Sequence, residues 1–176
     1  MKDSDFIVLL VDIPPEGLKK SLVVDGGPDL GLETAVPLDG PLEVELAVTR
    51  HGDEILIRGR LVGSVFLECS RCLETFRSPL DVEVETCLQR VGSQPREEDL
   101  ELTAEEIDVQ LLHRKDIDLR EYIAEHIHLG IPVKPLCDEG CLGLCSRCGK
   151  DLNGGSCTCP KEVADHRWDA LKGLKL

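Results

Sequence analysis

Residues 137–159 read CDEGCLGLCSRCGKDLNGGSCTC, and this stretch decides how the end of the chain folds. It holds six of the nine cysteines in the 176-residue chain, at the spacing C-x3-C-x3-C-x2-C-x8-C-x-C. A hydrophobic core does not need cysteine at this density. Thiols packed this closely along a sequence have two ordinary uses, metal binding and disulfide formation.

The spacing favours a metal. Cys145 and Cys148 form a C-x2-C turn, which lets two sulfurs face one ion at about 2.3 Å, and Gly149 can take the positive φ that closes the loop. A tetrahedral structural Zn²⁺ takes four such ligands. The candidate ligands are Cys137, Cys141, Cys145, Cys148, Cys157 and Cys159, of which Cys145, Cys148, Cys157 and Cys159 are the first choice.

Other arrangements of the same cysteines stay open. Cys137 and Cys141 are either substitutes or part of a second site, because the single residue between Cys157 and Cys159 is tight for two ligands of one ion. A disulfide knot is disfavoured, because the short apolar run at residues 6–11 lacks the form of a secretory signal. An iron–sulfur cluster can also be held by thiolates alone.

The net charge of −14 is unevenly distributed. Residues 133–176 carry 7 Lys/Arg and 6 Asp/Glu, which leaves a balance of −15 on residues 1–132. The acidic part should repel a phosphate backbone, so that only the tail is neutral enough to approach RNA. The candidate contacts with RNA or another partner are Arg147, Lys150 and Arg167. No run approaches the ~20 apolar residues of a membrane span. We expect a cytoplasmic protein that contacts no membrane and has no evident small-molecule substrate.

Alternating apolar residues predict strands in the first part of the chain. The expected strands are residues 6–13, 18–25, 42–49, 54–69, 76–87 and 107–111. Residues 51–53, His-Gly-Asp, predict a hairpin. The strand at 54–69 is long, and Gly59 and Gly63 lie on its apolar face, where a bend or bulge could form. The prediction is therefore an α+β fold with a curved antiparallel sheet or a partly closed barrel.

One long helix is predicted at residues 118–129. Asp118 at its N-cap and Glu121 three residues later have the form of a capping box, and Gly130 ends the helix. After the cysteines, Asp165 could cap a short final helix that carries Trp168, Leu171 and Leu174. These elements divide the chain into a β-rich body, residues 1–132, and a Cys-rich tail of zinc-knuckle type, residues 133–176.

Cys69 and Cys72 repeat the C-x2-C spacing at the end of a strand. They could form half of a second metal site, since two cysteines here and six in the tail supply two four-cysteine sites and leave only Cys87. They could equally be small apolar residues that close a turn. A redox dithiol is the third interpretation, although such pairs usually lie at a helix N-terminus.

Together these motifs resemble the YceD family, described as large ribosomal RNA subunit accumulation proteins. The resemblance is carried by a glycine-spaced strand that runs into CSRCL at residues 69–73, the helix followed by IPVKPLC at 131–137, GLCSRCGKDLN at 143–153 with Cys157 and Cys159, and DHRWDAL at 165–171. It covers nearly the whole chain in order, and residues 1–40 match only loosely.

The resemblance implies a non-enzymatic role in 23S ribosomal RNA accumulation and large-subunit assembly, with a ribosomal protein or the 23S rRNA precursor as partner. An acidic body suits a basic ribosomal protein better than bare RNA. Two other classes stay open. One is an enzyme, either a thiol oxidoreductase using Cys69 and Cys72 or a hydrolase, although an all-cysteine zinc lacks the open position that hydrolysis needs. The other is a zinc-ribbon adaptor unrelated to ribosomes.

Overall fold

A computed structural model describes residues 5–25, 30, 36–90, 109–160 and 167. Its largest element is a five-stranded mixed sheet in the order β2-β3-β4-β5-β6. The strands are β2 (Leu18–Val24), β3 (Leu42–His51), β4 (Glu54–Glu68), β5 (Thr75–Arg90) and β6 (Val109–Leu112). β1 (Ile7–Leu9) and β7 (Asp116–Asp118) form a separate antiparallel ribbon, a 3-10 turn (Leu10–Asp12) follows β1, and the helix is α1 (Leu119–Gly130).

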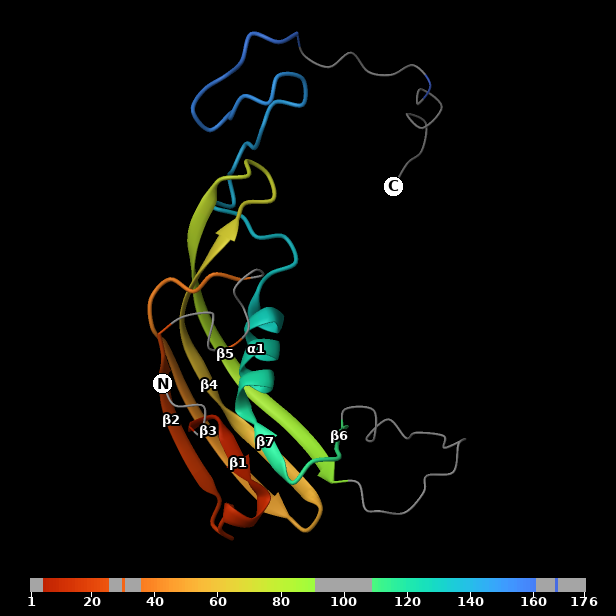
Figure 1. Cartoon of the computed structure of the whole chain (residues 1–176). Helices are drawn as coiled ribbons and strands as arrows, with labels where there is room; N and C mark the ends of the chain where they lie inside the picture. Colours follow the sequence, from red (N-terminus) through yellow and green to blue (C-terminus); the bar gives the residue numbers. More distant parts are fainter. Residues whose placement is uncertain (1–4, 26–29, 31–35, 91–108, 161–166, 168–176) are drawn as a thin grey trace.

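The α+β class and the order of the elements follow the prediction, but the arrangement of the sheet does not. The sheet is open, with β2 and β6 at its two ends, so the prediction of a partly closed barrel is wrong. α1 and the β1–β7 ribbon lie against one face of the sheet (Figure 1), and their apolar residues join those of the sheet in one core cluster. The core therefore lies between two layers, and no closure of the sheet is needed to bury it.

The sheet is mainly antiparallel, as predicted, with one parallel pair at its edge. β6 pairs with β5 in parallel, with Cys87 opposite Val109. A parallel neighbour needs a connection of a dozen or more residues, and the connection here, residues 91–108, has that length. The alternation of apolar residues along a strand does not show whether its neighbour runs parallel or antiparallel to it.

The alternation in β3 decides which face of the sheet is buried. Leu42, Val44, Leu46 and Val48 are all at most 3% exposed, whereas the intervening Glu43 and Glu45 face solvent. On the opposite face, ion pairs join neighbouring strands, Arg58 with Glu85 at 2.6 Å and Arg60 with Asp81 at 2.5 Å. The periodicity of two residues thus separates a buried from a charged face, as expected for a half-buried sheet.

The glycines of β4 act differently from the prediction. β4 pairs with β3 and β5 in an unbroken register, so there is no bulge at Gly59 or Gly63. A Cβ at position 59 would instead overlap the carbonyl oxygen of Glu45 on β3. Gly59 is therefore required by the close approach of the neighbouring backbone.

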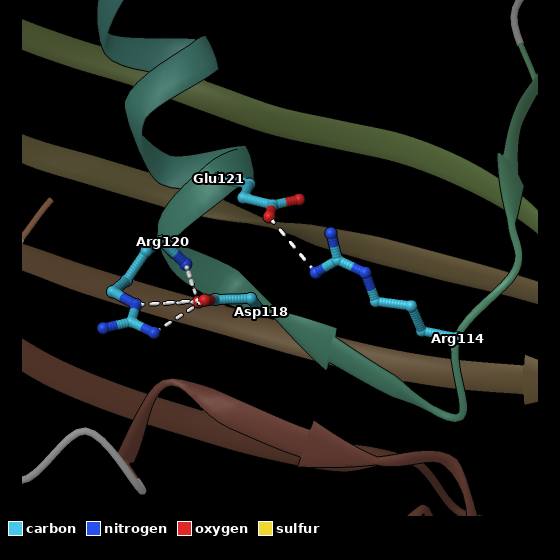
Figure 2. Close-up of polar contacts among 4 residues, drawn as sticks. All are labelled: Arg114, Asp118, Arg120 and Glu121. Atoms are coloured by element: carbon cyan, nitrogen blue, oxygen red, sulfur yellow. Dashed lines mark hydrogen bonds and ion pairs between the residues drawn. The ribbon is translucent and has the colours of Figure 1, made fainter. Parts of the chain in front are cut away.

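The start of α1 is held by a small polar cluster (Figure 2). The Asp118 carboxylate accepts the N–H of Arg120 at 3.0 Å, as predicted for the N-cap, and the Arg120 side chain also donates to it, which lowers the pKa of Asp118. The Glu121 carboxylate lies 3.4 Å from Arg114 Nη1, before β7, and so links the helix to the preceding turn. Asp118 is thus the N-cap, but its donor is Arg120 and not the Glu121 N–H of the predicted capping box, and the Glu121 side chain makes an ion pair instead.

Among the described residues, no helix is both long enough and apolar enough to cross a membrane. The final helix predicted around Trp168 falls outside the part of the chain that the structure describes. Only Arg167 is described there, and it is exposed.

The substitution Gly59→Ala should lower the free energy of unfolding by about 2–3 kcal/mol, because the added methyl group meets main-chain atoms that cannot rotate away. Gly63→Ala is the matched control, since its nearest contact, at 2.9 Å, is the flexible end of Leu42. Urea unfolding of the two variants measures the difference. Equal losses would mean that Gly59 has no special packing role.

Candidate functional site: two cysteine tetrads

Eight of the nine cysteines gather in two groups of four. Tetrad 1 consists of Cys69, Cys72, Cys137 and Cys141, and tetrad 2 of Cys145, Cys148, Cys157 and Cys159. Within each tetrad all four sulfurs lie within 4.8 Å of one another. The structure therefore brings the strand-end pair together with the first two cysteines of the tail. All four cysteines expected first to bind one ion lie together in tetrad 2.

The sulfur distances suit one tetrahedral ion in each tetrad. Four ligands at 2.3 Å from a zinc ion would be separated by about 3.8 Å. The Sγ–Sγ distances are 3.8 Å for Cys69–Cys141 and 3.7 Å for Cys72–Cys137 in tetrad 1, and 3.4 Å for Cys145–Cys157 in tetrad 2. All nine cysteines are free thiols. Each tetrad could hold a metal ion, and the tight spacing of Cys157 and Cys159 does not prevent this.

Each tetrad is built on a C-x2-C turn of the same design, which we call knuckle 1 (residues 69–73) and knuckle 2 (residues 145–149). In knuckle 1, Leu73 N–H donates to the Cys69 carbonyl at 2.9 Å and Cys69 N–H donates to Glu74 at 2.9 Å. Knuckle 2 repeats both hydrogen bonds at the same distances, from Gly149 to Cys145 and from Cys145 to Lys150. The residue after the second cysteine has a positive φ in both turns, +62° at Leu73 and +69° at Gly149.

The tail is attached to knuckle 1 by main-chain hydrogen bonds. Ser70 N–H donates to the Pro135 carbonyl at 2.8 Å, and Leu144 N–H donates to the Arg71 carbonyl at 3.1 Å. The Arg71 side chain donates to the carbonyls of Glu139 and Cys141 at 3.0 and 2.8 Å. These contacts cross the boundary predicted between residues 132 and 133, and the division into two domains stays a prediction.

Two further residues join the tetrads closely. Asn153, from the loop of tetrad 2, donates to the sulfur of Cys141 in tetrad 1 at 3.3 Å and accepts the N–H of Leu142 at 2.8 Å. Gly143 is buried with φ +70°, and a Cβ there would lie 2.9 Å from the Arg71 carbonyl oxygen. Outer hydrogen bonds of this kind orient metal ligands. Asn153 and Gly143 thus fix the position of tetrad 2 beside tetrad 1.

The thiols within a tetrad differ strongly in pKa. Main-chain N–H groups, that of Cys137 first, lower the pKa of Cys69 to about 6, and the N–H of Cys148 does the same to Cys145. Desolvation raises the pKa of Cys137 to about 12, and a hydrogen bond with Cys148 raises that of Cys159 to about 12. Four neighbouring thiolates repel one another, so a tetrad needs a cation to ionise completely.

The low pKa of Cys69 does not favour the redox interpretation. A catalytic dithiol must present its nucleophilic sulfur to a substrate. Cys69 is 0% exposed and Cys72 is 5% exposed, and both pack against Leu136 and Leu144 of the tail. The same main-chain N–H groups that stabilise a thiolate for attack also stabilise it as a metal ligand, and the burial favours the second use.

The remaining predicted residues lie apart from the tetrads or at their surface. Arg147 and Lys150 are exposed beside tetrad 2, and Lys150 Nζ donates to the Ser156 carbonyl at 2.9 Å. Cys87 lies on β5, where its sulfur is 4.0 Å from Glu54, and burial raises its pKa.

One sequence feature that relates the two turns goes beyond the predictions made above. Both turns read Cys-Ser-Arg-Cys, at residues 69–72 and 145–148, and this identity goes beyond the C-x2-C spacing. The repeat indicates that the two turns share one conformation and that Cys69 and Cys72 belong to a metal-type site. The role of Asn153 had no comparable signal, because it depends on how the two tetrads pack.

These features define a class of protein. Its members have an open mixed sheet with one long hairpin, and two cysteine knuckles, one in that hairpin and one in the C-terminal tail. A family model, the large ribosomal RNA subunit accumulation protein YceD, matches residues 57–175, which include all eight tetrad cysteines. The chain belongs to the YceD family.

Individual relatives agree with this assignment. An uncharacterized protein of Mycobacterium tuberculosis is 31% identical over 124 residues, 70% of this chain and 58% of the relative. The large ribosomal RNA subunit accumulation protein YCED homolog 1, chloroplastic, of Arabidopsis thaliana is 36% identical over 61 residues, 35% of this chain and 19% of the relative. Its Zea mays counterpart is 45% identical over 51 residues, 28% and 17% of the two chains.

The chain spans a little over half the length of the mycobacterial relatives and less of the plant proteins. No solved structure is detectably similar to it.

Exchanging the residues after the two C-x2-C pairs tests the shared design of the knuckles. Leu73→Gly should tighten Zn²⁺ binding at tetrad 1, and Gly149→Leu should weaken it at tetrad 2 by about tenfold, because a side chain at positive φ costs about 1–2 kcal/mol. Competition with a chromophoric chelator measures both affinities. The control is Leu142→Gly, an exposed leucine outside both knuckles. The same loss of affinity in both exchanges would contradict a common geometry.

Proposed function

We propose that this chain is a non-enzymatic factor that supports the accumulation of 23S ribosomal RNA and the assembly of the large ribosomal subunit. The observation that carries the proposal is the family match over residues 57–175, whose description names large ribosomal RNA subunit accumulation. The plant relatives carry the same words in their names. The factor would act by binding a ribosomal protein or the 23S rRNA precursor.

Both tetrads are proposed to hold a structural Zn²⁺. The support is chemical, because four thiolates at tetrahedral spacing are the ligand set that structural zinc prefers. Four cysteines also complete the coordination and leave no position for a substrate or a reactive water, which supports a non-enzymatic role. Tetrad 1 would join the β4–β5 hairpin to the tail, and tetrad 2 would shape the tail itself.

Charge favours a protein over bare RNA as the direct contact. The balance of −15 on residues 1–132 complements a basic ribosomal protein and opposes a phosphate backbone. The tail is close to neutral, and its exposed cations Arg147, Lys150 and Arg167 are the candidates for contact with the partner.

Metal content distinguishes the two-site arrangement from every alternative. Elemental analysis of the purified protein should find two zinc ions per chain. The double substitution Cys69→Ser with Cys72→Ser should leave one, because it removes half the ligands of tetrad 1 only, and Cys145→Ser with Cys148→Ser should do the same at tetrad 2. Cys87→Ser is the matched control and should keep both ions. Iron in place of zinc, or cystines without metal, would contradict the proposal.

The cellular role is tested by removing the gene and restoring it on a plasmid. Loss of the protein should lower the ratio of 23S to 16S rRNA and the amount of large subunit in a sucrose gradient. The wild-type gene and the Cys87→Ser variant should restore both, whereas the tetrad 1 double variant should not, because its tail loses its attachment to the hairpin. An unchanged ratio of 23S to 16S rRNA after gene deletion would contradict the proposed function.

A further inference from the structure

Knuckle 1 and knuckle 2 share a sequence and a conformation, but their outer surfaces differ. The outer surface of knuckle 1 is covered by residues 135–144 of the same chain. This segment belongs to no helix or strand, and it crosses the knuckle as an irregular stretch with one tight turn, in which Cys141 N–H donates to the Asp138 carbonyl at 3.0 Å. Figure 1 shows it meeting the β4–β5 turn at the end of the sheet. The molecule therefore contains one example of what a Cys-Ser-Arg-Cys turn can bind.

The binding at knuckle 1 uses groups that any peptide segment offers. The Arg71 guanidinium donates to two main-chain carbonyls, those of Glu139 and Cys141. Leucine side chains, Leu136 and Leu144, pack against the buried sulfurs beside these contacts. Recognition thus combines one arginine, which satisfies main-chain carbonyls, with an apolar contact next to the cysteines.

Knuckle 2 presents the same two elements, with residues 156–160 beside it in place of residues 135–144. Arg147 stands at the position of Arg71 and is exposed, and its side chain makes no hydrogen bond or ion pair with another residue that the structure describes. Arg147 also lines a hollow of about 430 Å³ that adjoins the tetrad 2 cysteines Cys145, Cys157 and Cys159 and two serines. Its apolar lining comes from Leu144, Leu152 and Pro160. An arginine next to an apolar hollow repeats the combination found at knuckle 1.

We propose that knuckle 2 is a docking site for an irregular segment of a partner protein. The main-chain carbonyls of that segment would accept hydrogen bonds from Arg147, and a leucine-sized side chain would fill the hollow beside tetrad 2. This inference rests on the proposed function and deepens it, because it makes the direct partner of the tail a protein.

The lining of the hollow favours a peptide over a nucleic acid. An RNA strand would require several cations along its phosphates and aromatic faces for its bases. The residues around the hollow include one cation, Arg147, and no aromatic side chain. Lys150, the nearest cation in sequence, is held by the Ser156 carbonyl. An apolar pocket with a single polar anchor is instead typical of peptide recognition.

The first probe is a fluorescein-labelled peptide that copies residues 133–144 with Cys137→Ser and Cys141→Ser, because this segment already fits a Cys-Ser-Arg-Cys turn. Fluorescence anisotropy with the full metal-loaded chain should show saturable binding. Arg147→Ala should weaken it about tenfold, as expected for loss of a charged hydrogen bond. Arg58→Ala, on the outer face of the sheet, is the matched control and should bind like wild type. Absorption of the Co²⁺-substituted variants verifies that both tetrads remain formed.

Several outcomes would overturn the proposal. The first is no binding, or binding that Arg147→Ala leaves unchanged. Loss of binding in Arg71→Ala alone would mean that the peptide exchanges into knuckle 1. Tighter binding of a second peptide, residues 161–176, would mean that the end of this chain occupies knuckle 2. A dimer that dissociates in the Arg147→Ala variant would mean that the occupant is a second copy of the chain. Arg147-dependent binding of a single-stranded RNA without peptide binding would identify a nucleic-acid site.

The same variants separate this inference from the proposed function. If the peptide binds through Arg147 but gene deletion leaves the rRNA ratio unchanged, the docking site is supported and the role in subunit assembly is contradicted. If the peptide fails to bind but deletion lowers 23S rRNA, the docking site falls and the cellular role stands.

Discussion

The contact between two distant pairs of cysteines in tetrad 1 determines where the tail of this protein lies. Cys72 and Cys137 are 65 residues apart in sequence, yet their sulfurs are 3.7 Å apart. Closing so long a loop costs conformational entropy, which a metal ion or another strong contact must offset. Once residues 135–144 are held on knuckle 1, Cys145 follows directly, so the position of tetrad 2 depends on tetrad 1.

The body and the tail are stabilised by different physics. The body buries a continuous apolar cluster between the sheet, α1 and the β1–β7 ribbon. Within residues 133–160, which the structure describes, the apolar side chains of the tail that join the cysteines and Phe76 in a small cluster are Leu136 and Leu144. A four-thiolate zinc contributes on the order of 10 kcal/mol at neutral pH, enough to replace the missing apolar core. This difference explains why the cysteines are concentrated where the apolar residues are few.

The distribution of charge distinguishes the Cys-rich end from the rest of the chain. On the exposed face of the sheet, Arg58 and Arg60 are paired with Glu85 and Asp81 across the strands. Exposed pairs of this kind contribute little stability, but they neutralise the charge of these two arginines. The tail carries a balance of +1 and presents Arg147 beside an apolar hollow. An acidic body behind such an end would favour approach by a basic partner.

Local structure and the supply of ligands follow from the sequence alone. Alternation with a period of two predicted β3 and β4 within a few residues, Asp118 predicted the start of α1, and the count of cysteines predicted enough thiols for two tetrads. Only the tertiary structure decided which cysteines meet, that β6 runs parallel to β5, that the sheet stays open, and that Gly59 makes room for Glu45. The reason is that periodicity and spacing report contacts between near neighbours in the chain. Cys69 and Cys72 follow β4, whereas Cys137 and Cys141 follow α1. Whether the two pairs meet therefore depends on how α1 packs on the sheet.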